Sequence, residues 1–281
     1  MRWGTYGFAV EGLDAPSAIL TIAGPDWPTL GIVRTRRGAT DEGRPAHAGI
    51  AELTFDDERA VIWLSDTESV SLDRFPELRV TFMTDYDLSD DLVAHPFIGL
   101  PAAVASRWLG RQILHGGGIV VGDQAWAVLG TKEAGKSSTL GWLARDGHGI
   151  VSDDLLMLVG TTVFAGPRSV DLRSETADVL GGDYLQIQAG RTRHRLRPAA
   201  VPGALPLGGI VYLEWGSAVS VEEVPPIERL PRLIQNSVLG PTLEDSAAYL
   251  DLATLPTVRF VRPRGFDGFA AAIDQLLAAL A

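Results

Sequence analysis

The segment Gly130–Ser137 has the residue types and the spacing that bind phosphate. It reads GTKEAGKS and fits the pattern G-x-x-x-x-G-K-[ST] at every fixed position. Glycines let backbone N–H groups turn inward around phosphate oxygens, and the N-terminus of a following helix adds partial positive charge. The pattern predicts that Lys136 reaches the β- and γ-phosphates of a nucleotide and that the Ser137 hydroxyl ligates Mg²⁺.

Lysine usage singles out the same segment. Lys132 and Lys136 are the only lysines among the 24 Lys and Arg residues of the chain, and both lie in this segment. A compact ammonium suits a phosphate cradle better than a planar guanidinium does. The placement therefore favours a phosphate site over a fortuitous glycine-rich turn.

The flanking sequence predicts a strand before the motif and a helix after it. Ala125–Leu129 is a short apolar run, typical of a buried strand. Lys136–Arg145 places Leu140, Leu143 and Ala144 on one helical face. This strand–loop–helix arrangement is the context that a phosphate-binding loop requires.

The next predicted strand, Gly149–Asp154, ends in two adjacent carboxylates, Asp153 and Asp154. In an α/β sheet that strand runs parallel to the one before the motif, so both carboxyl ends meet at one edge. One aspartate would then lie near Mg²⁺ while the other accepts a proton from an attacking hydroxyl. Because adjacent strand residues point to opposite sides, both can act only if the strand bends there. The alternative is that the second aspartate only caps a turn.

The order of these features resembles a known family. Leu114-His115, an apolar strand, GTKEAGKSS, a helix, a Gly-His dipeptide and Ser152-Asp153-Asp154 are similar to HPr serine kinase/phosphorylase. The similarity is closer still to the HPr-kinase-like enzymes that accompany the biosynthesis of ribosomally made peptides, lasso peptides among them. Its strong part spans roughly residues 113–173, about a fifth of the chain, and a weaker similarity runs on toward the C-terminus.

The resemblance implies a P-loop kinase that uses ATP and Mg²⁺ to phosphorylate a serine side chain. It implies Asp153 as the catalytic base, Lys136 as the phosphate-binding cation and a supporting role for His115. The metal would be held by Ser137 and Asp154. The expected nucleotide-binding residues are Gly130, Thr131, Lys132, Glu133, Ala134, Gly135, Lys136, Ser137 and Ser138.

One signature of that family is absent. A glutamate before an Arg-Gly pair is expected downstream, whereas the corresponding region, Ala165–Arg173, reads AGPRSVDLR. The absence bears on regulation and on HPr recognition more than on phosphoryl transfer. Arg168 or Arg173 could neutralise charge on the transferred phosphoryl group, or could pair with Asp171 to hold a loop.

The chain also has a concentrated basic segment, Arg191–Arg197. Strand alternation would put its four arginines on one side, whereas the flanking Gly190 and Pro198 suit a loop. One interpretation is a clamp for the γ-phosphate or for an acidic peptide. The other is a solvated edge strand whose charges discourage aggregation.

Composition limits the class of protein. The 281-residue chain is 46% hydrophobic with a net charge of −11, which indicates a globular protein and argues against a nucleic-acid partner. It has no cysteine, and no apolar run reaches the ~20 residues of a membrane span. We therefore expect a cytoplasmic protein without a membrane partner. Self-association into a homo-oligomer stays open.

The distribution of apolar runs, glycines and prolines along the chain predicts three parts within an α/β fold. Residues 1–94 carry short apolar runs separated by Gly, Pro and Asp, as in a small, mostly-β domain that serves as scaffold or docking unit. Residues 95–112 read as a hinge followed by a lead-in helix from Pro101 to Gln112. Residues 113–281 alternate strands and helices, as in a P-loop, HPr-kinase-like core.

The sequence thus predicts an ATP- and Mg²⁺-dependent kinase. Its acceptor would be a serine or threonine hydroxyl of a peptide or small protein. Three alternatives remain at this stage: an HPr-type regulatory kinase/phosphorylase, a nucleotide-binding regulatory protein without transfer chemistry, and a kinase for small molecules.

Overall fold

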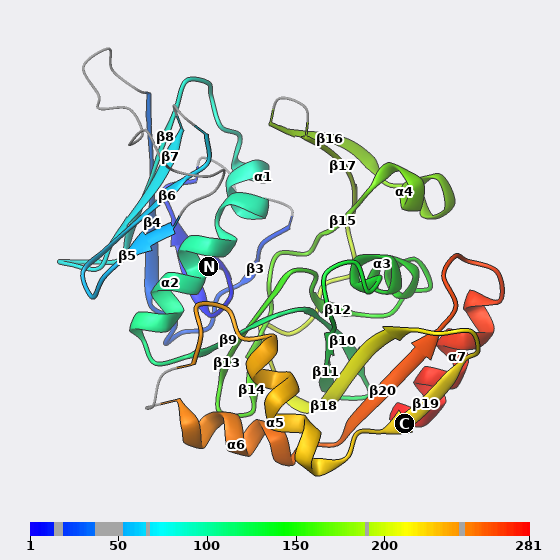
Figure 1. The fold of residues 1–281 in the computed structure, drawn as a ribbon. Coiled ribbons are helices and arrows are strands. Elements are labelled where there is room, and N and C mark those ends of the chain that lie inside the picture. The colour runs from blue at the N-terminus through cyan, green and yellow to red at the C-terminus, as the bar shows by residue number, and fades with distance from the viewer. Residues whose placement is uncertain (14–18, 37–52, 66–67, 189–190, 242–244) are drawn as a thin grey trace.

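The computed structural model describes residues 1–13, 19–36, 53–65, 68–188, 191–241 and 245–281 (Figure 1). These residues form a mixed α/β fold, as predicted, with three sheets and seven α-helices in the described part. No helix in these ranges is long and apolar enough to cross a membrane.

Within the described residues, the first sheet has eight strands, all between Trp3 and Thr84. Its order is β3-β1-β2-β4-β8-β7-β6-β5, and the β2–β4 and β4–β8 pairs are parallel. One face of β8 is buried and the other is not, which is the period-2 pattern of a half-buried strand. The strands are β1 (Trp3–Thr5), β2 (Phe8–Glu11), β3 (Thr21–Ile22), β4 (Thr29–Arg36), β5 (Leu53–Phe55), β6 (Arg59–Trp63), β7 (Ser69–Asp73) and β8 (Arg79–Thr84).

A helical connector links the first sheet to the second. It comprises α1 (Asp90–Leu92), the π-helical turn η1 (Val93–Phe97) and α2 (Gly99–Trp108). His95 breaks the helical run with extended backbone angles, as expected of a residue before proline.

The predicted lead-in helix is shorter than expected. It ends at Trp108 and not at Gln112, which already belongs to strand β9. The reason lies at Gly110, whose φ of 68° is left-handed and whose position just beyond the helix is the usual one for a glycine stop signal.

The second sheet contains nine strands in the order β12-β10-β11-β18-β14-β13-β9, with β20 pairing β18 and β19 pairing β20. Strand β10 lies between β11 and β12 and is antiparallel to both, so β11 and β12 run in the same direction. The strands are β9 (Gln112–His115), β10 (Gly117–Val121), β11 (Gln124–Leu129), β12 (Ile150–Ser152), β13 (Leu155–Val159), β14 (Thr162–Phe164), β18 (Ala204–Trp215), β19 (Ser220–Glu223) and β20 (Thr257–Arg262).

Helices cover both faces of the second sheet. Helices α3 (Lys136–Arg145) and α7 (Phe269–Leu280) share one buried cluster with β11 and β18. Helices α5 (Pro226–Gln235) and α6 (Ser246–Thr254) share another cluster with other residues of the same strands. The strand–loop–helix predicted around residues 130–135 is therefore part of this two-sided core.

A third sheet of three strands carries the basic segment. Its order is β15-β17-β16, formed by β15 (Val170–Leu172), β17 (Arg191–Leu196) and β16 (Asp183–Gln188), with α4 (Ser174–Leu180) between β15 and β16. The edge-strand interpretation is wrong, because β17 is the central strand. Its Arg195 is buried, which a solvated strand would not allow.

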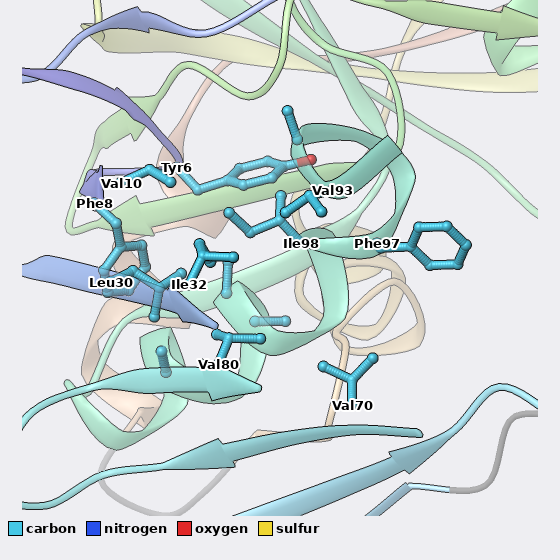
Figure 2. Close-up of a cluster of buried hydrophobic side chains, with 14 of the residues drawn as sticks. Tyr6, Phe8, Val10, Leu30, Ile32, Val70, Val80, Val93, Phe97 and Ile98 are labelled. Carbon is cyan, nitrogen blue, oxygen red and sulfur yellow. The ribbon is translucent and has the colours of Figure 1, made fainter. Parts of the chain in front are cut away.

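The first and second sheets share a hydrophobic core. Phe8 and Phe82 of the first sheet belong to the same buried cluster as Met157 of β13. Connector residues such as Val93 and Ile98 also lie in this cluster (Figure 2). The first sheet is thus packed directly against the part of the chain that holds the motifs.

Candidate functional site

The motif segment turns sharply between β11 and α3. Strand β11 ends at Leu129, and α3 begins at Lys136. Gly135 takes a left-handed φ of 86°, and a methyl group there would lie 2.4 Å from Nη2 of Arg262 and 2.8 Å from Cη2 of Trp215. Both the backbone angle and the lack of space require glycine at this position.

Lys136 folds its ammonium group into the turn. Its Nζ donates hydrogen bonds to the carbonyl oxygens of Gly130 at 2.8 Å and Thr131 at 3.1 Å. Burial lowers the pKa of Lys136, while the charges of Asp154 and Asp153 act in the opposite direction. The cation is therefore held at the mouth of the turn, facing the two aspartates.

The chain bends after β12, which is the condition under which both aspartates could act. Asp153 is buried, whereas Asp154 is exposed. Oδ2 of Asp153 accepts a hydrogen bond from the backbone N–H of Asp171 at 3.1 Å, and Oδ1 is buried with no donor among the described residues. Burial, followed by the charge of Asp154, raises the pKa of Asp153 to about 7, and the nearby Ser137 hydroxyl opposes that shift.

His115, at the end of β9, lies close to the side chain of Asp154. Its Nδ1 is 3.8 Å from Oδ1 of Asp154, and its backbone N–H donates to the carbonyl oxygen of Asn236 at 2.7 Å. Burial lowers the pKa of His115, Lys136 lowers it further, and Asp154 raises it. The imidazole therefore favours its neutral form beside Lys136.

The two serines of the motif have different surroundings. The Ser138 hydroxyl lies 3.2 Å from Oγ1 of Thr176 on α4, so it joins two helices. The Ser137 hydroxyl lies close enough to Asp153 to lower the pKa of that carboxyl. Only Ser137 thus combines a position at the start of α3 with a neighbouring carboxylate.

The remaining motif residues are fixed by the end of β18. The carbonyl oxygen of Glu133 accepts a hydrogen bond from Nε1 of Trp215 at 3.0 Å, and its carboxylate lies 3.3 Å from Nη2 of Arg173. Lys132 and Thr131 are exposed. Ala134 is buried in the cluster beneath the turn.

One pocket of about 430 Å³ gathers most of the predicted site residues. Lys136, Ser137, Asp153, Asp154 and His115 all line it. Gly130, Thr131 and Ala134 shape the turn but are not among the lining residues. The other lining residues are His95, Pro96, Lys132, Glu133, Gly135, Ser138, Asp171, Leu172, Arg173, Glu175, Thr176, Ile187, Arg193, Trp215 and Arg264.

The sequence did not reveal a network of charged side chains around Asp171, the residue whose backbone N–H donates to Asp153. Arg195 binds both carboxylate oxygens of Asp171 at 2.8 and 2.9 Å, and Nε2 of His95 lies 3.4 Å from the same carboxylate. Strand register sets Asp171 directly opposite Arg195. The alternation of arginines in β17 was the available signal, but it did not reveal the partner.

Two arginines beside the motif were also missed. Arg262 is buried, donates to Oγ1 of Thr139 at 3.1 Å and lies 4.3 Å from the ring centre of Trp215. Burial lowers its pKa to about 10. Arg264 is exposed, lines the pocket and lies 5.3 Å from the same ring centre.

The sequence analysis named Arg168, Arg173 and the arginines of Arg191–Arg197, and some of these line the pocket. Arg173 and Arg193 line it, whereas Arg168 does not. Arg197 pairs with Asp91 at 3.5 Å, outside the pocket lining.

The donor set fits a hard cation that arrives with a phosphate ligand. Among the described residues, no group of three or more His, Cys, Asp and Glu side chains could hold a metal alone. Two carboxylates and a serine hydroxyl nevertheless meet here, and Oδ1 of Asp153 is buried without a partner. Mg²⁺ commonly takes one or two carboxylates and completes its shell with water and phosphate oxygens.

Comparisons with known proteins give limited information. No protein-family model matches the chain, and no curated protein matches it. A solved structure of the HPr(Ser) kinase/phosphatase from Coxiella burnetii is similar over 60% of this chain and 95% of that chain, with 13% sequence identity and a TM-score of 0.30. A similarity at this level gives no residue-by-residue correspondence, so the functional argument rests on the geometry of the pocket.

Proposed function

We propose that this chain is a Mg²⁺- and ATP-dependent kinase that phosphorylates a serine or threonine hydroxyl of a peptide or small protein. One observation carries the proposal. A buried lysine at the start of α3 and a buried carboxylate at the end of β12 line the same pocket, at one edge of the sheet. Phosphoryl transfer needs both a cationic phosphate cradle and a group that accepts the proton of the attacking hydroxyl.

Each residue would have a defined role. Lys136 would exchange its two carbonyl partners for phosphate oxygens of ATP, and Ser137 and Asp154 would hold Mg²⁺. When bound, Mg²⁺ neutralises charge on the β- and γ-phosphates. Asp153 would take the proton from the acceptor hydroxyl as the new oxygen–phosphorus bond forms and the bond to ADP breaks. A pKa of about 7 suits a base that works near neutral pH.

The experiment is calorimetric titration of ATP with Mg²⁺, followed by transfer of labelled phosphate from ATP to candidate peptides. We expect Lys136→Ala to abolish transfer and to weaken ATP binding, because the buried ammonium is the cation nearest the turn carbonyls. Lys132→Ala is the matched comparison, since Lys132 is exposed and should lose much less affinity. Wild-type affinity in Lys136→Ala would reject the phosphate-site assignment.

The acceptor class is tested separately. Transfer to a peptide hydroxyl would support the peptide-kinase proposal, and transfer only to small molecules would reject it. ATP binding without transfer to any acceptor or to water would favour a nucleotide-binding regulatory protein instead.

A further inference from the structure

The turn between β1 and β2 has an unusual backbone conformation. Thr5 and Phe8 pair across it, and the two residues between them, Tyr6 and Gly7, have φ values of 56° and 76°. Two-residue hairpin turns of this kind usually carry Asn, Asp or Gly, and a bulky residue with positive φ is rare. Such a conformation persists where the surroundings hold it, and it is found preferentially at functional sites.

Residues of the second sheet and of the chain beside it hold this turn. The backbone N–H of Tyr6 donates to the carbonyl oxygen of Ala165 at 2.7 Å. The buried guanidinium of Arg111 donates to the carbonyl oxygens of both turn residues at 3.2–3.4 Å. Arg111 itself lies between two rings, 4.6 Å from the centre of Phe8 and 4.9 Å from that of Phe164. The first sheet is thus fixed to the second through its turn.

The Tyr6 side chain reaches the end of β12. It is 1% exposed and lies in the shared core that Figure 2 shows. A methyl group on Gly166 would lie 2.8 Å from Cε1 of Tyr6 and 2.4 Å from Oγ of Ser152. The Tyr6 ring and the Ser152 side chain therefore both lie next to Gly166. The Gly166 N–H also donates to the carbonyl oxygen of Val151 at 2.8 Å. Ser152 directly precedes Asp153.

The surroundings of the phenol agree with this placement. Burial raises the pKa of Tyr6, the charges of Asp154 and Asp153 raise it further, and the Ser152 hydroxyl lowers it. The charges of both aspartates therefore act on the Tyr6 phenol, which belongs to the first sheet.

The phosphate-binding turn has separate supports. Trp215 holds the carbonyl oxygen of Glu133, and Arg262 holds Thr139 in the first turn of α3. Neither support involves the first sheet. A disturbance at Tyr6 should therefore reach the aspartate end of the pocket and leave the phosphate end in place.

We propose that Tyr6 is a positioning residue for Asp153, so that the first sheet is a working part of the catalytic centre. Its ring braces the end of β12 and sets where the Asp153 carboxylate lies. This inference rests on the proposed role of Asp153 as the base.

Hydrogen–deuterium exchange and ATP turnover by the full chain, with water as acceptor, test the inference. We expect Tyr6→Ala to speed exchange in residues 150–156 by about tenfold or more, with residues 130–138 unchanged. Turnover should fall roughly 10- to 100-fold, because small misplacements of a catalytic group are costly, while the dissociation constant for ATP with Mg²⁺ stays within about twofold. Tyr6→Phe keeps the ring and should restore most of the turnover.

Phe82→Ala is the matched control, because Phe82 is fully buried in the same cluster on β8. It should lower stability without changing exchange in residues 150–156. If Tyr6→Ala does not fold, Gly166→Ala disturbs the same contact by one methyl group and should give the same pattern.

Three outcomes would overturn the inference: unchanged exchange in residues 150–156, an equal change in Phe82→Ala, or a parallel loss of ATP affinity. A wild-type chain that neither binds nor hydrolyses ATP would reject the proposed function. The exchange comparison would still decide whether Tyr6 braces β12.

Discussion

The backbone N–H of Asp171 donates a hydrogen bond to Oδ2 of Asp153 across 3.1 Å. Arg195 fixes the Asp171 side chain, so the small third sheet determines where that donor lies. A donor to a carboxylate favours the charged form and opposes the effect of burial. The arrangement fixes one oxygen of Asp153 and leaves Oδ1 without a donor in the described part of the chain.

The two serines of the motif should respond differently to substitution. Ser137→Ala should raise the Mg²⁺ concentration needed for half-maximal ATP turnover, because it removes the hydroxyl proposed to hold the ion. Ser138→Ala removes the contact with Thr176 and should lower stability slightly instead. Magnesium titrations of both variants check this, and equal effects would contradict the assignment.

The two aspartates should separate proton transfer from metal binding. Asp153→Asn should cut turnover by about 10²–10⁴-fold, as expected for loss of a general base, with little change in ATP affinity. Asp154→Asn should weaken Mg²⁺-dependent ATP binding. Measuring both constants for both variants decides between this assignment and its reverse, in which Asp153 holds the metal together with Ser137. Full activity in both variants would make the pair structural.

The raised pKa of Asp153 predicts an unusual dependence of stability on pH. Its pKa is about 7 in the fold against an ordinary 3.8, so the folded state favours the protonated form. That contribution is present below pH 4 and is lost as pH rises through about 7. At ~1.4 kcal/mol per pKa unit, it amounts to at most about 4 kcal/mol.

Asp153→Asn should therefore exceed the wild type in stability by more at pH 8 than at pH 5, where only about a third of the contribution has been lost. Urea unfolding at both pH values measures this. Asp123→Asn, in an exposed turn, is the control and should show no such difference. Wild-type turnover should rise as pH passes about 7, because the base acts only when deprotonated.

Arg264 should contribute to nucleoside binding more than to phosphate binding. It lies 5.3 Å from the ring centre of Trp215 at the rim of the pocket, where a base could stack on the pair. Arg264→Ala should weaken ATP binding about two- to fivefold, the size of an exposed cation–π contact. Calorimetry with tripolyphosphate should show no change. An equal loss for both ligands would place Arg264 on the phosphates, and Arg259→Ala serves as a control outside the pocket.

The sequence predicted the local elements of the site well, because each has a strong local signal. Apolar runs and glycines located β11, α3 and β12, whereas the bend after β12 was only a condition for both aspartates to act. It also predicted that β11 and β12 run in the same direction. It could not show that β10 lies between them, because strand order depends on pairing between distant residues.

The contacts that hold the site residues in place could not be predicted from the sequence, for the same reason. Asp171 and Arg195 are 24 residues apart, and only the β15–β17 register sets them opposite each other. Tyr6 reads as an ordinary apolar residue in the sequence, and its contact with Gly166 requires the packing of two sheets. The edge-strand interpretation of Arg191–Arg197 was wrong, since nothing local shows that β17 is central.

Strand β18 has a consequence for the order in which the chain can fold. It pairs with β11 on one side and β20 on the other, and its first residues pair with β14. During synthesis the segment 130–138 leaves the ribosome long before residues 204–215 do. Until then β11 lacks one neighbour and Glu133 lacks the indole that holds its carbonyl oxygen. The proposed nucleotide site should therefore be completed late in synthesis, once residues 204–215 have emerged.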